Sequence, residues 1–134
     1  MLEICVGIII DGDEIVLSKR AEHVHQGGKW EFPGGKVESS ETAAKALVRE
    51  CNEELGIEVI GAALVDQFEY SYPEKTLKFS VFVVDEFDGE PKGCEGQLVQ
   101  RVHWRQLDDL EFPAANVRMV DWVKHYFTRC GESA

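Results

Sequence analysis

Three carboxylates stand within five positions of one another in the stretch RECNEELG, residues 49–56: Glu50, Glu53 and Glu54. In a helix, positions i, i+3 and i+4 are neighbours, so these side chains can converge on one point. Converging carboxylate oxygens form a natural site for Mg²⁺, a hard cation that prefers oxygen ligands. A solvated acidic face is the alternative, because like-charge pairs on a helix cost only about 0.2–0.5 kcal/mol each. Although the carboxylates lie at the unfavourable, C-terminal end of the helix dipole, the helix by itself leaves both interpretations open.

The helix that carries these carboxylates has recognisable ends. It is predicted to begin near Ser40 or Thr42, either of which can cap it, and to end at Gly56. One apolar stripe follows the helical spacing and is expected to face the core: Ala44, Leu47, Val48, Cys51 and Leu55. The acidic side chains lie on the neighbouring face.

The rest of the chain reads as a mixed sheet with a second helix. Strands are predicted at residues 3–10, 14–20, 57–65, 75–85 and 98–104, the first of them buried on both faces. Loops are expected at 21–29 and 88–97, and turns at 11–14, 69–73 and the Pro-Gly-Gly segment that follows Trp30 and Phe32. A helix over 116–127 carries Val117, Val120, Val123 and Phe127 at helical spacing. This order of elements predicts an α/β sandwich.

The composition is that of an ordinary soluble globular protein. The 134 residues are expected to form a single domain, 1–134, and 44% of them are hydrophobic and 29% charged. The longest apolar run, 6–10, is too short to cross a bilayer, and Glu3 stands where a signal peptide would be basic. We therefore expect a cytoplasmic protein with no membrane partner.

The formal net charge of −11 argues against direct binding of nucleic acid, which needs clustered Lys and Arg to displace phosphate counterions. A small anionic ligand remains compatible with this charge if a bound cation or local basic residues reverse the field.

The four cysteines are widely spread and form no C-x-x-C pair: Cys5, Cys51, Cys94 and Cys130. In an intracellular chain this pattern favours reduced thiols packed as small apolar groups over disulfides or zinc.

The spacing upstream of the acidic stretch adds a much more specific signal. Gly35 is followed after five residues by Glu41, and seven more residues separate Glu41 from Arg49 and Glu50. The stretch GKVESSETAAKALVRECNEELGI, residues 35–57, resembles the Nudix box, G-x5-E-x7-R-E-U-x-E-E-x-G-U with U apolar, at every fixed position. The one soft departure is Cys51, where the family usually has an aliphatic residue, and a buried thiol packs as a small hydrophobe.

The resemblance implies a Nudix-type α/β/α sandwich with a mixed sheet and a Mg²⁺-dependent hydrolase, with Mn²⁺ as a substitute. Its substrates would be nucleoside diphosphates linked to another moiety. By the family's pattern the metal site would take Gly34, Gly35, Glu50, Glu53, Glu54 and Glu95. Glu50 would act as the base, and Glu41 and Arg49 would form a supporting pair. Lys36 would offset charge on the leaving phosphate, or else is a solvated lysine.

Within the family, the chain resembles most closely the MutT-type enzymes that hydrolyse 8-oxo-dGTP. The segments that carry this resemblance are WEFPGGKVE (30–38), EYSYP (69–73), DGEPKGCEGQ (88–97) and EFPAAN (111–116). Glu95 falls where those enzymes have a loop carboxylate, although a lone loop glutamate is usually solvated.

Asn116 corresponds to the residue that reads the purine in those enzymes; its alternative role is an N-cap of the following helix. Oxidation at C8 moves a proton onto N7, so N7 becomes a donor beside the O6 acceptor. One Asn amide, which has both a donor and an acceptor, can pair with both. Unmodified guanine would leave the amide oxygen unpaired, at a cost of about 1–3 kcal/mol.

Four further residues are predicted to lie near the nucleotide: Arg20 at a phosphate, and His25, Phe32 and Tyr72 at the base or sugar. Structural roles for Arg20, His25 and Tyr72 are equally open. Lys75 stands where the MutT-type enzymes have an arginine, so a bidentate contact there would be weakened.

The favoured function is thus hydrolysis of 8-oxo-dGTP to 8-oxo-dGMP and pyrophosphate, which cleans the nucleotide pool and avoids mutation, by an enzyme expected to be a monomer. A related diphosphatase that prefers CTP or modified pyrimidine nucleotides is a second interpretation. A non-catalytic module that recognises oxidised guanine is a third, and the complete set of acidic residues argues against it.

Overall fold

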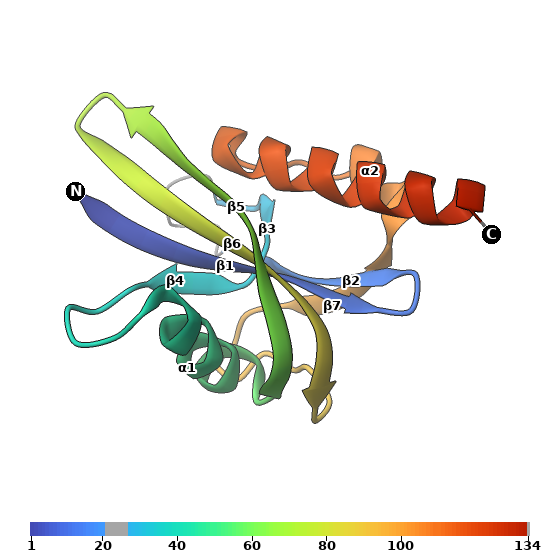
Figure 1. Ribbon diagram of the computed structural model, residues 1–134, viewed down its shortest axis with the longest axis horizontal. Helices are drawn as coiled ribbons and strands as arrows, with labels where there is room; N and C mark the ends of the chain where they lie inside the picture. Colours follow the sequence, from blue (N-terminus) through green and yellow to red (C-terminus); the bar gives the residue numbers. More distant parts are fainter. Residues whose placement is uncertain (21–26, 134) are drawn as a thin grey trace.

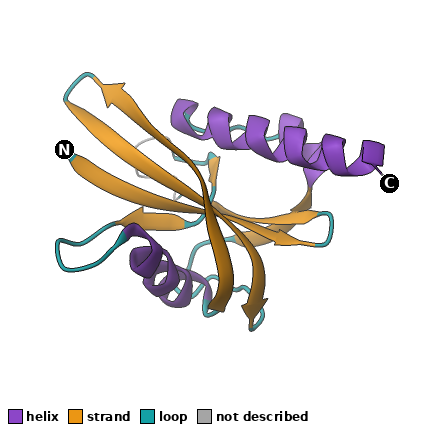
Figure 2. Cartoon of the chain, in the orientation of Figure 1, coloured by secondary structure: helices purple, strands orange, loops and turns teal. Residues whose placement is uncertain are grey.

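The computed structural model describes residues 1–20 and 27–133. Seven strands, two helices and two short 3₁₀ helices (η1 and η2) follow one another along the chain (Figures 1 and 2): β1 (Leu2–Asp11), β2 (Glu14–Lys19), β3 (Trp30–Glu31), β4 (Gly34–Lys36), α1 (Ala43–Leu55), β5 (Glu58–Tyr72), β6 (Lys75–Asp88), β7 (Val99–His103), η1 (Trp104–Asp109), η2 (Ala114–Asn116) and α2 (Val117–Ser133). Most of the predicted loop 21–29, with His25, lies outside the described residues.

The sheet is mixed, as predicted. Its main order is β3-β2-β1-β6-β5, while β4 also pairs with β1 and β7 with β2. β1 runs parallel to β6 and antiparallel to β2 and β4. The predicted turn at residues 11–14 connects β1 to β2, where Asp11 pairs with Glu14.

α1 and α2 lie on opposite sides of the sheet, and two hydrophobic cores result (Figure 1). Alternate residues of β1 supply the two cores: Ile8 belongs to the core with Val120 and Val123 of α2, and Ile9 to the core with Leu47 of α1. The prediction that the first strand is buried on both faces is confirmed, and so is the α/β/α sandwich. Among the described residues no helix is long and apolar enough to cross a membrane.

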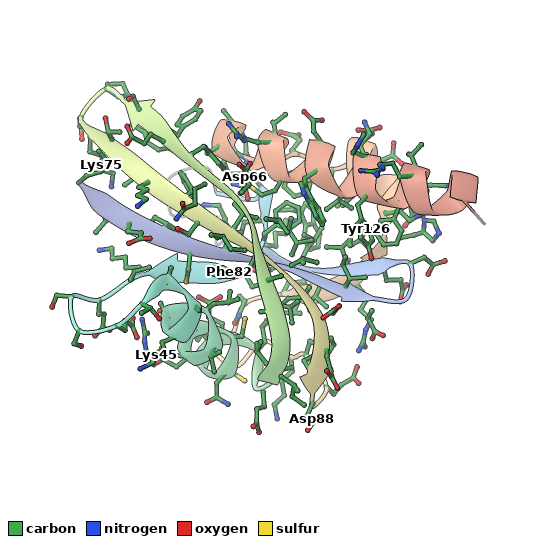
Figure 3. All side chains as sticks on the ribbon, in the orientation of Figure 1. Lys45, Asp66, Lys75, Phe82, Asp88 and Tyr126 are labelled. Atoms are coloured by element: carbon green, nitrogen blue, oxygen red, sulfur yellow. The ribbon has the colours of Figure 1, made fainter. Side chains whose placement is uncertain are left out.

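Both predicted ends of α1 are confirmed. Of the two candidate caps it is Thr42 whose side-chain oxygen accepts a hydrogen bond from the Lys45 amide, at 3.2 Å. Gly56 adopts a left-handed conformation with φ of 70° and donates its amide to the Asn52 carbonyl. Lys45, labelled in Figure 3, points away from the sheet.

The predicted apolar stripe of α1 is partly wrong. Ala46, Leu47, Cys51 and Leu55 are buried, whereas Ala44 is exposed and Val48 is 42% exposed. Because Ala46, Glu50 and Glu54 are four residues apart, burying Ala46 turns the acidic side of the helix toward the sheet. The helix therefore orients Glu50 and Glu54 inward and leaves the Val48 side chain exposed.

β5 is longer than predicted, and the turn expected at residues 69–73 is wrong. The strand continues to Tyr72, which pairs with Lys75, so that only Pro73 and Glu74 connect β5 to β6. Tyr70 and Tyr72 pack on the core that α2 covers. This burial keeps the polar-looking segment extended.

Two short strands flank Phe32 and Pro33, and the second of them, β4, takes up the two glycines of the predicted Pro-Gly-Gly turn. β3 pairs with β2, and β4 pairs with β1, where Gly35 lies opposite Cys5 and Gly34 opposite Val6. β4 also contacts α1, so it links the sheet directly to the acidic helix.

Two smaller expectations need correction. Val117 at the start of α2 is 50% exposed, and Met119 is buried in its stead. Cys5 and Cys51 are free, buried thiols as predicted, whereas Cys94 is free and exposed; the side chain of Cys130 lies outside the described part.

Candidate functional site

The site begins where β4 passes α1. A Cβ atom on Gly35 would lie 2.5 Å from Cδ and Oε2 of Glu50, so the carboxylate occupies the space that any other side chain would fill. At Gly34 the same atom would lie 2.0 Å from the Cys5 carbonyl oxygen. Gly35 thus lets the helix approach β4 closely, with Glu50 against the β4 backbone, and Gly34 lets β4 lie close to the backbone of β1.

Glu54 lies beside Glu50. Its Oε1 accepts a hydrogen bond from the Gly34 amide at 3.4 Å. Burial, a hydrogen bond to Glu50 and the charge of Glu50 raise the pKa of Glu54 to about 9, and the charge of Glu95 adds to the effect. Glu50 and Glu54 therefore form a carboxylate pair that holds a proton at neutral pH when no cation is present.

Arg49 organises the other acidic side chains. Its guanidinium contacts Glu41 at 2.6 Å, Glu50 at 2.8 Å and Glu53 at 3.3 Å, and it donates to the Lys36 carbonyl at 3.1 Å. The predicted Glu41–Arg49 pair forms, and its hydrogen bond lowers the pKa of Glu41. Arg49 thereby fixes the orientation of Glu50.

The arrangement around Glu53 differs from the expected convergence of three side chains. Glu53 is turned toward Arg49 and its side chain is 52% exposed, so Glu50 and Glu54 alone meet at β4. Within residues 1–20 and 27–133, no three His, Cys, Asp or Glu side chains are grouped closely enough to hold a metal ion. Lys36 is exposed on β4, and Glu95 is exposed on the segment after β6.

The donor set fits a hard divalent cation. The ligands at hand are carboxylate and backbone oxygens, which Mg²⁺ and Mn²⁺ prefer. Two adjacent carboxylates, one of them with a pKa of about 9, are destabilised when both are ionised, and a bound cation would relieve that repulsion.

This pair predicts how the metal-free protein responds to pH. The folded protein binds the Glu54 proton more tightly (pKa about 9) than the unfolded chain does (4.5), so the stabilisation is full below about pH 4.5 and is lost as the pH rises through 9. We expect the melting temperature of the protein in a chelator to fall from about pH 5 to about pH 9, and to fall less in Glu54→Gln. Circular dichroism melts measure this, with Glu58→Gln, an exposed glutamate, as the control. Equal slopes in wild type and Glu54→Gln would contradict the assignment.

A cavity of about 750 Å³ extends from β4 to the β5–β6 turn. This volume is in the range of pockets that hold small-molecule ligands. Its lining includes Gly34 and Gly35, which contact the acidic pair, and four predicted nucleotide contacts: Arg20, Phe32, Tyr72 and Asn116. Lys75 also lines it, from the tip of the β5–β6 hairpin (Figure 3). His25, the fifth predicted contact, lies outside the described residues.

Asn116 does not stand at the start of its helical segment. Helical structure begins with η2 at Ala114, and Asn116 is the last residue of η2 before α2. Its Oδ1 accepts a hydrogen bond from the Phe32 amide at 3.4 Å. The oxygen end of the side-chain amide therefore faces the backbone just after β3. The amide is thus anchored at the cavity wall and keeps polar capacity for a ligand.

Glu31 was not among the predicted site residues. It lines the cavity, and both of its carboxylate oxygens accept from Nη1 of Arg20, at 3.0 and 3.1 Å. Burial raises the pKa of Glu31, and the charge of Arg20 opposes that effect. Recognising β3 as a strand paired with β2 would have brought Glu31 near Arg20.

The close contact at Gly35 leads to a second prediction. In Gly35→Ala, the new methyl group must displace the Glu50 carboxylate, which is the end of a flexible side chain, so the fold should tolerate the change. We expect a loss of about 10²-fold in kcat with a small change in melting temperature, as for a reacting group moved by about 1 Å. Gly61→Ala is the matched control, because its Cβ would meet no atom closer than 3.4 Å. Wild-type turnover by Gly35→Ala would show that the position of Glu50 is unimportant.

Comparisons with known proteins agree with this architecture. The family model described as NUDIX domain matches residues 1–126. A Haemophilus influenzae protein named 8-oxo-dGTP diphosphatase is 39% identical over 121 residues, which cover 90% of this chain and 89% of the relative. An Escherichia coli protein named CTP pyrophosphohydrolase is 34% identical over 115 residues, or 86% of this chain and 84% of the relative.

A solved structure gives the same result for the fold. It comes from work on MutT of Aliivibrio salmonicida and Vibrio cholerae, and it superposes with a TM-score of 0.83 at 41% sequence identity. The match covers 91% of this chain and 95% of that chain.

Proposed function

The chain belongs to the NUDIX domain family, and from that premise we propose that it is an 8-oxo-dGTP diphosphatase. It would hydrolyse 8-oxo-dGTP to 8-oxo-dGMP and pyrophosphate and so keep the oxidised nucleotide out of DNA. The observation that carries the proposal is that one cavity has Asn116, Gly34 and Gly35 in its lining, and that the Glu50 carboxylate lies against Gly35. The 39% identity to a relative named 8-oxo-dGTP diphosphatase supports it.

Nudix hydrolases generally need a divalent metal, and the cation we propose is Mg²⁺, which Mn²⁺ can replace. Glu50, Glu54 and a carbonyl of Gly34 or Gly35 would hold it, with Glu53 and Glu95 as further ligands. When bound, the cation would neutralise phosphate oxygens and lower the pKa of the attacking water.

The residues around the pair have separate tasks in this proposal. Glu50, whose carboxylate lies against the cavity-lining Gly35, accepts the proton of the attacking water. Arg49, held by Glu41, keeps Glu50 in that orientation. Lys36 offsets charge on the leaving pyrophosphate, and Arg20 contacts a phosphate of the substrate.

Base selection is proposed for the other part of the cavity. The Asn116 amide accepts from N7–H of 8-oxoguanine and donates to O6, whereas Phe32 and Tyr72 line the base and sugar. Lys75 supplies a single charge and cannot make the bidentate contact of an arginine.

A pyrimidine nucleotide is the second candidate substrate, because a relative that covers 86% of this chain is named CTP pyrophosphohydrolase. We further propose that residues 1–134 act as one domain and as a monomer on a free nucleotide, without direct contact to nucleic acid.

Product analysis tests the reaction type. With 8-oxo-dGTP and Mg²⁺, anion-exchange chromatography and ³¹P NMR should detect 8-oxo-dGMP and pyrophosphate in equal amounts. Release of inorganic phosphate with a nucleoside diphosphate would contradict the proposed diphosphatase reaction.

A further inference from the structure

Residues 89–98, between β6 and β7, are bound to the C-terminal end of α1. They leave β6 after Asp88, which is labelled in Figure 3. The Lys92 amide donates to the Leu55 carbonyl, and the Cys94 amide to the Glu54 carbonyl, each at 3.0 Å. The segment therefore satisfies carbonyl groups that the helix end leaves without intrahelical partners.

Gln97 makes the most specific of these contacts. Its Nε2 donates to the Glu54 carbonyl at 2.9 Å, and its Oε1 accepts from the Glu95 amide at 2.9 Å. One side-chain amide thus joins the backbone of Glu54 to the backbone of Glu95. Only a side chain with a donor and an acceptor at this length can make both bonds, and Gln97 is half-buried in this position.

The surrounding turn is built closely around Gln97. A Cβ atom on Gly93 would lie 1.9 Å from the Gln97 carbonyl oxygen, and the Gly96 amide donates to the Gly93 carbonyl at 3.1 Å. Gly96 has a φ of +83°, which side chains rarely adopt. The chain between Gly93 and Gln97 is therefore a compact turn that carries Glu95 on its exposed side.

The Glu54 carbonyl accepts from both the Cys94 amide and Gln97 Nε2, and Gln97 in turn accepts from the Glu95 amide, so the backbone of Glu95 lies next to the C-terminal end of α1 at Glu54. We propose that Gln97 is a positioning residue, whose amide holds Glu95 beside Glu54 so that Glu95 contributes to binding the divalent cation. This inference rests on the proposed function only for the role of Glu95 as a ligand.

The first test measures the two hydrogen bonds of the Gln97 side chain in the absence of metal and nucleotide. In Gln97→Met, which keeps the side-chain length and removes both polar ends, the amides of Cys94 and Glu95 should exchange with deuterium about tenfold faster or more, since opening costs about 1.4 kcal/mol less per factor of ten. Gln97→Ala should behave alike. Gln100→Ala, an exposed glutamine on β7, is the control and should exchange as wild type does. Unchanged exchange at Glu95 would overturn the inference.

The second test uses Mn²⁺ alone as the probe, with its affinity measured by EPR. Gln97→Met should weaken Mn²⁺ binding by about tenfold, at the low end of the effects seen for residues that orient metal ligands. Glu95→Gln should weaken it similarly, and adding Gln97→Met to Glu95→Gln should cause no further loss. Equal losses in both backgrounds, or unaltered binding in Glu95→Gln, would overturn the inference.

The two tests separate this inference from the proposed function, because neither uses a nucleotide. A protein that passes both and does not cleave 8-oxo-dGTP keeps the Gln97 assignment and loses the proposed substrate. A protein that cleaves 8-oxo-dGTP and fails either test keeps the substrate and loses the assignment.

Discussion

Glu54→Gln is expected to lower kcat for 8-oxo-dGTP by about 10³-fold, within the range for removal of a group that transfers protons or organises the reacting water. The amide keeps an oxygen that can accept from the Gly34 amide, as Glu54 Oε1 does at 3.4 Å. It removes a carboxylate that burial and Glu50 make costly to ionise. The variant should therefore lose activity while its metal-free form becomes more stable than wild type near about pH 9.

Steady-state kinetics and thermal melts of the same preparations check this pair of opposite effects. Glu50→Gln should lose activity to a comparable extent, because Glu50 is the proposed base, lies against Gly35 and contacts Arg49. Glu58→Gln removes one charge from an exposed site just after α1 and should keep wild-type activity. If Glu50→Gln and Glu54→Gln both hydrolyse substrate as well as wild type, the carboxylate pair is not the catalytic centre.

Asn116→Ala is expected to erode the preference for 8-oxo-dGTP over dGTP by about 5- to 150-fold, the equivalent of 1–3 kcal/mol for one unpaired group. The amide is anchored by the Phe32 backbone and lines the cavity, so its loss removes the pairing with N7–H and O6 and little of the enclosure. The kcat/KM for dGTP should change much less.

The ratio of kcat/KM for the two nucleotides in wild type and Asn116→Ala measures this effect, and dGTP serves as the internal control. A purely structural role would instead lower the melting temperature and slow both substrates alike. An unchanged ratio would mean that Asn116 does not read the base.

The local features that position the acidic helix could be predicted because each depends on neighbouring residues. Thr42 caps α1 and Gly56 ends it, as the sequence indicates. The Glu41–Arg49 pair was predicted from the resemblance to the Nudix box, whereas the hydrogen bond from Arg49 to the Lys36 carbonyl was not predicted. The mostly apolar, β-branched run of β1 was sufficient to predict that both of its faces are buried.

Features that depend on contacts between distant segments could not be predicted. Val48 is as apolar as a core residue, and only the approach of β4 explains why α1 buries Ala46 and turns Glu50 inward. Tyr70 and Tyr72 extend β5 because a core lies beneath them. Glu31 and Gln97 gain their partners from other elements, so no local pattern distinguishes them from solvated side chains.

The central claim is that this site hydrolyses an oxidised purine nucleotide, and kcat/KM measured on a substrate panel tests it most directly. With Mg²⁺, the panel compares 8-oxo-dGTP, dGTP, CTP and 5-methyl-dCTP under the same conditions. The account predicts that kcat/KM is highest for 8-oxo-dGTP. A higher kcat/KM for CTP or 5-methyl-dCTP would contradict it.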